Sequence, residues 1–270
     1  MTLENTANEM RKLVIEGVYS AKSGHPGGSL SICDILAVLF FEEMNIDPLN
    51  AKDPNRDRFV LSKGHAAPAL YAALTTKGYF PKADIKTLRK IDSYLQGHPC
   101  MNKIPGVDMS TGSLGQGLSA ANGMALVGKY EKKDYRVYTL CGDGEIQEGQ
   151  IWEAAMTAAH YKLDNLTVFV DVNNLQIDGT TDEVMSIGDA GKKFDAFGFN
   201  VVAIDGHNLD EIRGAIKTAK ETKGKPTAVI CKTVKGKGVS FMENAVGFHG
   251  AAPNDEQYKL AMEELNGRAL

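Results

Sequence analysis

The sequence predicts an α/β fold of three layers, in which a parallel sheet lies between helices on both of its faces. The runs Tyr135–Leu140 (YRVYTL) and Leu166–Val170 (LTVFV) are rich in β-branched and aromatic residues, which favours strands. The segment between them, Glu148–Tyr161, is expected to be a helix. Two strands joined by a helix form a βαβ unit, so we expect their carboxyl ends at the same edge of a parallel sheet.

The other elements continue this alternation. Near the start, Met10, Leu13, Val14, Gly17 and Val18 form an apolar stripe with helical spacing, which predicts a helix over Thr6–Ala21. Further helices are expected at Ile32–Glu43, Ala66–Lys77, Leu118–Tyr130, Asp210–Lys220 and Asp255–Leu265, and further strands at Arg58–Leu61, Asn200–Ile204 and Pro226–Cys231. No long linker or internal repeat interrupts the series. We therefore expect a single domain over residues 1–270, with 1–12 and 255–270 as peripheral terminal segments.

Composition argues against several classes of protein. A net charge of −4 over 270 residues gives no support for a nucleic-acid or anionic-membrane surface. The longest apolar run, Ile35–Phe41, is too short to span a bilayer. The four cysteines are scattered without CxxC spacing, so neither a zinc site nor a disulfide framework is indicated. We expect a cytoplasmic protein that binds neither nucleic acid nor membrane.

Polar residues follow both strands of the βαβ unit. Asp143 stands between two glycines after the first strand, and Asn173 follows the second strand about thirty residues later. A carboxylate, an amide oxygen and nearby backbone carbonyls are hard ligands suited to Mg²⁺ or Ca²⁺. A lone Gly-Asp-Gly more often marks a turn, but the acid, the spacing and the Asn173-Asn174 pair together favour a metal site. A single carboxylate leaves the ion positive, so phosphate oxygens are expected to complete its shell.

This pattern resembles a known motif. Gly-Asp-Gly followed about thirty residues later by Asn-Asn is similar to the thiamine diphosphate and metal motif of thiamine-dependent enzymes. From about Leu13 to Gly250 the chain resembles the N-terminal segment of transketolases, and at 270 residues it looks like the N-terminal, diphosphate-binding half of a split transketolase. The strings SGHPGG (23–28), SKGHAAPALY (62–71) and GSLGQG (112–117) carry the resemblance, which implies the thiamine diphosphate-binding fold.

The resemblance implies a set of cofactor contacts. Leu175 joins Asp143 and Asn173 through its backbone carbonyl as a ligand of Mg²⁺, for which Ca²⁺ or Mn²⁺ could substitute. Contacts with thiamine diphosphate itself are implied for His65, Gly112, Leu114, Gly144, Asn173, Ile177 and His249. Within this set, His65 and His249 contact the diphosphate, Gly112 offers its carbonyl to the aminopyrimidine, and Leu114 and Ile177 lie near the thiazolium.

The resemblance also implies catalytic residues. His25 and His98, each in a Gly-His-Pro string, face the substrate, and His249 contacts substrate as well as diphosphate. Glu148 contacts the cofactor-activating glutamate of a partner domain. Cys100 stands where the family usually has an acidic residue, so the chain departs from the family in the loop that carries His98.

The implied reaction passes a two-carbon glycolaldehyde unit from a ketose phosphate to an aldose phosphate. The activating glutamate and most groups for the distal phosphate belong to later domains of the family. A separate subunit with the pyrimidine-binding and C-terminal domains is therefore expected, in an α2β2 assembly.

Three alternatives remain open. The chain could act on an unusual sugar, such as a sulfonated or branched one. It could be the α subunit of a 2-oxo acid dehydrogenase, which shares the Gly-Asp-Gly and Asn-Asn motif but does not combine the histidine strings found here. It could also be a non-catalytic cofactor-binding subunit, although the set of histidines argues against that.

Overall fold

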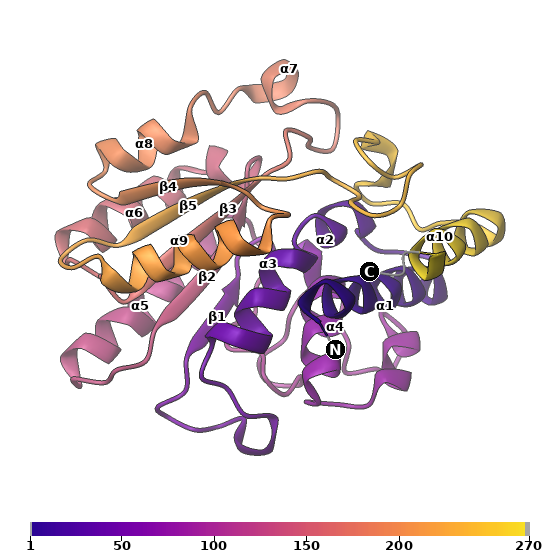
Figure 1. The fold of residues 1–270 in the computed structure, drawn as a ribbon, viewed down its shortest axis with the longest axis horizontal. Coiled ribbons are helices and arrows are strands. Elements are labelled where there is room, and N and C mark those ends of the chain that lie inside the picture. The colour runs from indigo at the N-terminus through magenta and orange to yellow at the C-terminus, as the bar shows by residue number, and fades with distance from the viewer. Residues whose placement is uncertain (1, 268–270) are drawn as a thin grey trace.

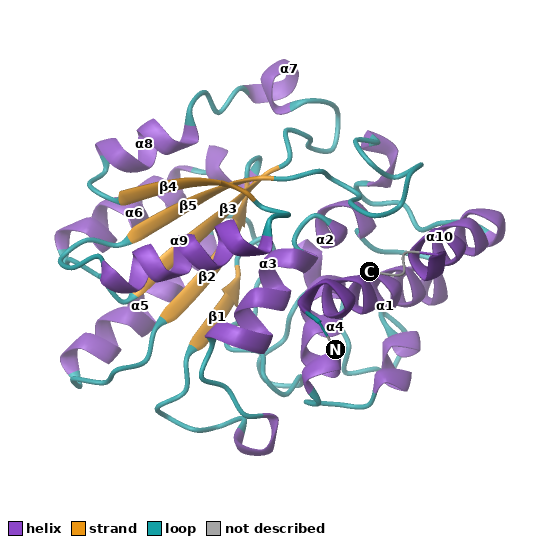
Figure 2. Ribbon diagram, viewed as in Figure 1, coloured by secondary structure: helices purple, strands orange, loops and turns teal. Residues whose placement is uncertain are grey.

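The computed structural model describes residues 2–267 and contains one five-stranded parallel sheet (Figures 1 and 2). The strands are β1 (Arg58–Leu61), β2 (Val137–Gly142), β3 (Leu166–Val172), β4 (Asn200–Asp205) and β5 (Thr227–Lys232). Their order across the sheet is β1-β2-β3-β5-β4, so β5 lies between β3 and β4. The predicted α/β fold with a parallel sheet is confirmed.

Helices cover both faces of this sheet (Figure 1). The helices are α1 (Leu3–Ala21), α2 (Pro26–Leu30), α3 (Cys33–Val38), α4 (Ala67–Lys77), α5 (Gln116–Tyr130), α6 (Gly149–His160), α7 (Thr181–Met185), α8 (Ala190–Ala196), α9 (Leu209–Glu221) and α10 (Asp255–Gly267). One face packs against α3 and α9, with α1 and α4 beyond them, and the other packs against α5, α6 and α8. None of the helices within residues 2–267 is long and apolar enough to cross a membrane.

The two faces arise from the alternation of side chains along each strand. In β3, Phe169 points into the core formed with α1, α3, α4 and α9, whereas Val168 and Val170 point into the core formed with α5, α6 and α8. These strands are apolar on both sides because a parallel sheet is buried on both faces. Asp171 has the parity of Phe169, so its carboxylate lies on the side of the first core, fully buried.

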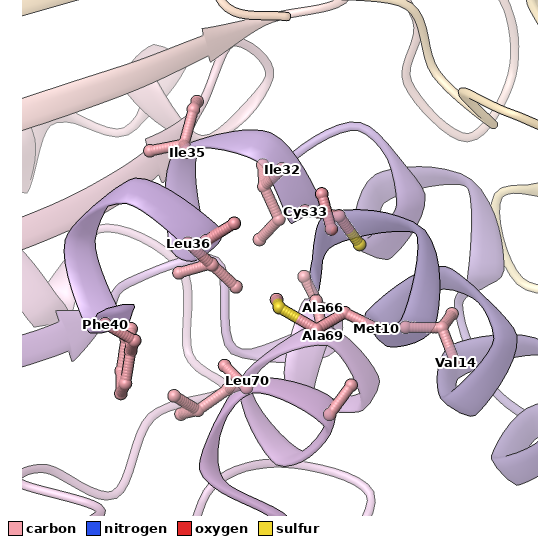
Figure 3. Close-up of a cluster of buried hydrophobic side chains, with 14 of the residues drawn as sticks. Met10, Val14, Ile32, Cys33, Ile35, Leu36, Phe40, Ala66, Ala69 and Leu70 are labelled. Carbon is pink, nitrogen blue, oxygen red and sulfur yellow. The ribbon is translucent and has the colours of Figure 1, made fainter. Parts of the chain in front are cut away.

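Helices α1, α3 and α4 pack together beside the sheet (Figure 3). Met10 and Val14 from α1 meet Ile32 and Leu36, and Leu70 from α4 closes the cluster. The terminal segments contribute to the same core, since Ala7 and Met10 near the start and Ala261 and Leu265 in α10 are fully buried. The segments expected to be peripheral are thus partly interior where the structure describes them, and residues 268–270 lie outside the described range.

Most elements occur where they were expected, with shifted ends. The strand predicted for 135–140 runs over Val137–Gly142, and that predicted for 166–170 continues to Val172. The helix predicted for 32–43 is α-helical only over Cys33–Val38 and continues as a π-helix over Leu39–Glu43, where the Met44 amide donates to the Leu39 carbonyl. The short helices α7 and α8 were not anticipated.

Candidate cofactor and substrate site

A cavity of about 360 Å³ lies at the carboxyl ends of β1, β2 and β3. This is the edge of an open α/β sheet where ligands generally bind. Every predicted site residue except His98 lines it: His25, His65, Gly112, Leu114, Asp143, Gly144, Glu148, Asn173, Leu175, Ile177 and His249. Residues spread over more than two hundred positions of the chain therefore converge on one hollow.

The βαβ unit brings the two halves of the central motif together. Gly142 and Asp171 are paired residues of adjacent strands, so the residues that follow them are neighbours. The backbone amide of Asn174 donates to Asp143 Oδ2 at 2.6 Å, and the amide of Gly144 donates to Asp143 Oδ1 at 2.8 Å. Asn174 has a φ of 62°, which turns the chain back toward Asp143. The predicted meeting of the two strand ends is present.

The oxygen atoms at this point fit a hard divalent cation. Asp143 is only 3 % exposed and forms no ion pair with any described residue. Asn173 donates from Nδ2 to Asp171 at 2.9 Å, and its Oδ1 accepts from the Leu175 amide at 3.2 Å while keeping a second lone pair for an ion. With the carbonyl of Leu175, these residues offer a carboxylate, an amide oxygen and a backbone oxygen, the donor types preferred by Mg²⁺.

No cation among the described residues pairs directly with the carboxylate of Asp143, although the charge of Lys63 acts on it from a distance. Burial, and then the negative charge of Asp171, raises the pKa of Asp143 to about 6. The two backbone hydrogen bonds from Gly144 and Asn174 reduce this rise but do not cancel it. A bound cation would supply the missing positive charge, so the electrostatics of the carboxylate agree with a metal-binding role.

An ion pair beneath the cavity was not foreseen. Lys63 Nζ lies 2.6 Å from Asp171 Oδ2, and both side chains are almost completely buried. Asp171 also accepts hydrogen bonds from Ser31, Asn173 and Thr233. Burial opposes ionisation of Asp171, but the charge of Lys63 and these donors outweigh it and hold the pKa below its usual value. The sequence signal was an acid directly after an apolar strand.

Three histidines form a triangular cluster in the cavity. The ring centres of His25, His65 and His249 are 5.2 to 5.5 Å apart. Burial, and then the charge of Arg89, lowers the pKa of His25 to about 4. Burial, and then Lys235, lowers the pKa of His249 to about 3, and burial holds the pKa of His65 well below its usual value. All three rings are therefore neutral at pH 7.

Lys235 is a second residue that the sequence reasoning missed. The basic segment 232–237 was not expected to make an anion site by itself, yet Lys235 reaches the cavity. Its Nζ donates to the Leu175 carbonyl at 2.8 Å and to His249 Nδ1 at 2.7 Å. Burial, and then the charge of Lys63, lowers the pKa of Lys235 to about 8. The ammonium has no lone pair, so His249 Nδ1 must accept and its Nε2 carries the proton.

His98 lies next to the cavity rather than in its lining. A Cβ atom on Gly112 would approach the His98 ring to 3.1 Å, so the two residues pack in direct contact. Arg89, Lys90, Gln96 and Gly97 surround His98 in a separate shallow hollow. His98 thus lies beside the cavity, and its position facing the substrate stays a prediction.

The rim of the cavity contains exposed residues. Glu148 is exposed at the N-cap position of α6, where its side chain makes no capping hydrogen bond, and the side chain of Ile177 is 68 % exposed. The nearby apolar residue Met185 is 61 % exposed.

The comparisons with known proteins agree with this geometry. A family model described as "Transketolase, thiamine diphosphate binding domain" matches residues 2–267. The chain is 49% identical over 263 residues to the 6-deoxy-6-sulfo-D-fructose transketolase subunit SqwG of Clostridium sp. (strain MSTE9), covering 97% of this chain and 96% of that protein. It is 44% identical to a subunit of the apulose-4-phosphate transketolase of Phocaeicola vulgatus, covering 99% of this chain and 95% of that protein.

Longer transketolases match over part of their length. Human transketolase is 45% identical over 249 residues, which is 92% of this chain but only 39% of the human protein. The crystal structure of transketolase from Campylobacter jejuni superimposes with a TM-score of 0.93 at 38% identity, covering 98% of this chain and 43% of the other. These relatives confirm the transketolase interpretation and do not favour the 2-oxo acid dehydrogenase alternative. The chain belongs to the family of transketolase thiamine diphosphate-binding domains.

Proposed function

We propose that this chain is the cofactor-binding subunit of a two-chain transketolase. The whole chain would act as one domain and, with a partner subunit, transfer a two-carbon glycolaldehyde unit from a ketose phosphate to an aldose phosphate in the pentose phosphate pathway. One observation carries the proposal: the oxygen donors of Asp143, Asn173 and Leu175 share a single cavity with the neutral histidine cluster. A metal-diphosphate site and groups for proton transfer are thereby adjacent.

Each part of the cavity has a role in this proposal. Asp143, Asn173 and the Leu175 carbonyl would hold Mg²⁺. Lys235 would neutralise charge on the diphosphate, and the uncharged His65 would donate a hydrogen bond to it. Thiamine diphosphate supplies, when bound, the nucleophilic carbon and the electron sink needed to break a carbon–carbon bond. The protein contributes binding, orientation and proton transfer.

The histidines suit proton transfer because they are uncharged. His249 Nε2 carries its proton and can donate to a phosphate or to a substrate oxygen. His25 lines the cavity as a neutral ring, so it can accept a hydroxyl proton from a bound ketose. His98, next to Gly112, would guide the substrate toward this point.

The open rim supports the need for a partner. Glu148 and Ile177 are exposed beside the cavity, and the human relative is covered over only 39% of its length. We propose that a separate subunit with the pyrimidine-binding and C-terminal domains covers this rim, contacts Glu148 and supplies the activating glutamate, in an α2β2 assembly. The four cysteines are unpaired, which agrees with a location in the cytoplasm.

The proposal is tested by assaying the purified chain with Mg²⁺ and thiamine diphosphate, first alone and then with the partner subunit. We expect weak cofactor binding and no ketose cleavage by the chain alone, and turnover of ketose phosphates once the partner is present. Pyruvate-type oxo acids should not be consumed. Robust turnover by the lone chain would refute the requirement for a partner.

A second substrate class is supported by the relatives. One relative is named for a sulfonated sugar and another for apulose 4-phosphate, and both are covered almost completely by this chain. The same assay run with 6-deoxy-6-sulfo-fructose, a branched ketose phosphate and xylulose 5-phosphate would rank the donors. A higher kcat/KM for the sulfonated donor would favour that class.

A further inference from the structure

Glu145 is a buried carboxylate in the lining of the cavity, and its hydrogen bonds reach three separate segments. It opens the 3-10 turn Glu145–Gln147 that follows β2, and it is 2 % exposed. Its Oε1 accepts from Ser62 Oγ at 2.5 Å and from the Gly115 amide at 3.0 Å. Its Oε2 accepts from the Gly142 amide at 3.0 Å.

Each of these donors lies next to a residue of the candidate site. Ser62 directly follows the first strand and stands three residues before His65, and Gly115 directly follows Leu114 at the start of α5. Gly142 is the last residue of β2 and directly precedes Asp143. One side chain therefore joins the loops that carry the implied diphosphate, thiazolium and metal contacts.

The loops that Glu145 joins are also in direct backbone contact. A Cβ on Gly64 would come within 2.7 Å of the Gly112 amide nitrogen, and a Cβ on Gly117 within 2.5 Å of Ser62 Oγ. Such close approach leaves no room for side chains between the loops, so a shift of one loop would displace the other. Glu145 is hydrogen-bonded to both loops, through Ser62 and Gly115.

Hydrogen-bond donors, with a smaller contribution from the charge of Lys63, stabilise the Glu145 carboxylate. No Lys, Arg or His of residues 2–267 forms an ion pair with it, in contrast to Asp171, which is paired with Lys63. All three of its partners are donors, and a carboxylate offers only acceptors. An amide at this position would place an NH₂ group against at least one N–H or O–H donor and leave that donor without a partner.

We propose that Glu145 is a positioning residue for cofactor binding, which holds the loops after β1, before α5 and after β2 in the arrangement that the cofactor requires. This inference rests on the proposed function, since it concerns the same cavity. Both carboxylate oxygens of Glu145 are bonded to donors of these loops, so it would act through Ser62, Gly115 and Gly142 on the residues beside them.

The test compares two matched substitutions in the full chain, Glu145→Gln and Asp57→Asn. Asp57 is also buried, at 7 % exposed, and its carboxylate accepts two backbone amides, from Asn45 and Arg136. It lies just before β1, at the opposite edge of the sheet from the cavity. Both substitutions replace a buried carboxylate by an amide, but only one of them affects the cofactor loops.

Calorimetry with thiamine diphosphate at saturating Mg²⁺ is the first measurement. We expect Glu145→Gln to bind about tenfold or more weakly than the unsubstituted chain, and Asp57→Asn to bind with unchanged affinity. The rise in Tm on adding cofactor should shrink for Glu145→Gln alone, although both variants lose stability without cofactor. Unchanged affinity in Glu145→Gln, or an equal loss in both variants, would overturn the inference.

Two further arms make the result unambiguous. Should Glu145→Gln fail to fold, Ser62→Ala removes one of the three donors while keeping the carboxylate, and it should weaken cofactor binding by a few-fold. Unchanged affinity in that variant would then refute the positioning role. Absence of thiamine diphosphate binding by the unsubstituted chain, alone and with its partner, would instead contradict the proposed function.

Discussion

Replacement of Asp143 by asparagine is expected to stabilise the cofactor-free chain while abolishing cofactor binding. The carboxylate is 3 % exposed and has no cationic partner among the described residues. Burial and the charge of Asp171 raise its pKa from 3.8 to about 6. A carboxyl whose pKa is raised by folding binds its proton more tightly in the folded state, so stability is lost as pH rises through this range.

The magnitude follows from the pKa change. At pH 8 the ionised carboxylate opposes folding by roughly 3 kcal/mol relative to the unfolded chain. Asparagine removes this charge, and its amide oxygen can still accept from either Gly144 or Asn174. The lost second hydrogen bond costs about 1 to 2 kcal/mol. We therefore expect Asp143→Asn to raise the free energy of unfolding by about 1 to 2 kcal/mol at pH 8, with the gain shrinking toward pH 4.

The assay is urea unfolding of both chains at pH 8 and pH 5 without cofactor, followed by calorimetry with Mg²⁺ and thiamine diphosphate. The variant should show no Mg²⁺-dependent binding, because an amide cannot replace the charge of the carboxylate ligand. Asp57→Asn serves as the control and should keep its binding. Cofactor affinity in Asp143→Asn equal to that of the unsubstituted chain would refute the metal assignment, and a lower stability at pH 8 would refute the electrostatic reasoning.

Three other outcomes are expected. Burial and the charge of Arg89 lower the pKa of His25 to about 4 in the folded chain. As pH falls below 6.5, the His25 ring is therefore protonated in the unfolded chain before it is protonated in the folded chain, and the free energy of unfolding decreases. His25→Asn should reduce this decrease by about 1 kcal/mol, a small value because the ring is partly exposed to solvent. The same pH dependence of urea unfolding in both chains between pH 7 and 4.5 would contradict this. Lys235→Met should weaken cofactor binding by about 10- to 100-fold in calorimetry. The control Lys232→Met replaces an exposed neighbour and should leave the affinity unchanged. Equal effects of the two substitutions would argue against a specific role for Lys235. The Asn208 side chain accepts hydrogen bonds from two backbone amides at the start of α9. Asn208→Ala should therefore lower the free energy of unfolding by about 1 kcal/mol without changing the affinity for the cofactor. A changed affinity would contradict this prediction.

Local pattern was enough to place the elements that carry the metal motif. The apolar runs of β2 and β3 and the helix between them can be recognised from composition and length. A βαβ connection then forces the two strand ends together, whatever the rest of the chain does. For that reason the meeting of Asp143 with Asn173 and Asn174 could be predicted without any knowledge of long-range contacts.

The resemblance to transketolases extended the prediction to the histidines, which no local pattern singles out. A histidine in a glycine-rich loop looks the same whether it is solvated or part of a site. The structure shows that His25, His65 and His249 converge, and that His98 contacts Gly112 in a hollow beside the cavity. Local sequence could not distinguish these cases, because burial of a loop depends on what packs over it.

The sequence by itself determined the α/β class, the order of strands and helices along the chain, and the approach of Asp143 to the Asn173-Asn174 pair, because these depend on periodicity and on one short connection. Tertiary structure alone decided the partners of Lys63, Asp171, Glu145 and Lys235. The strand order explains these contacts. Strand β5 lies between β3 and β4, so the residues after β5 meet those at the end of β3: Thr233 lies beside Asp171, and Lys235 lies beside Leu175. Contacts between residues 60 or more positions apart follow from that order, which alternation along the chain does not encode.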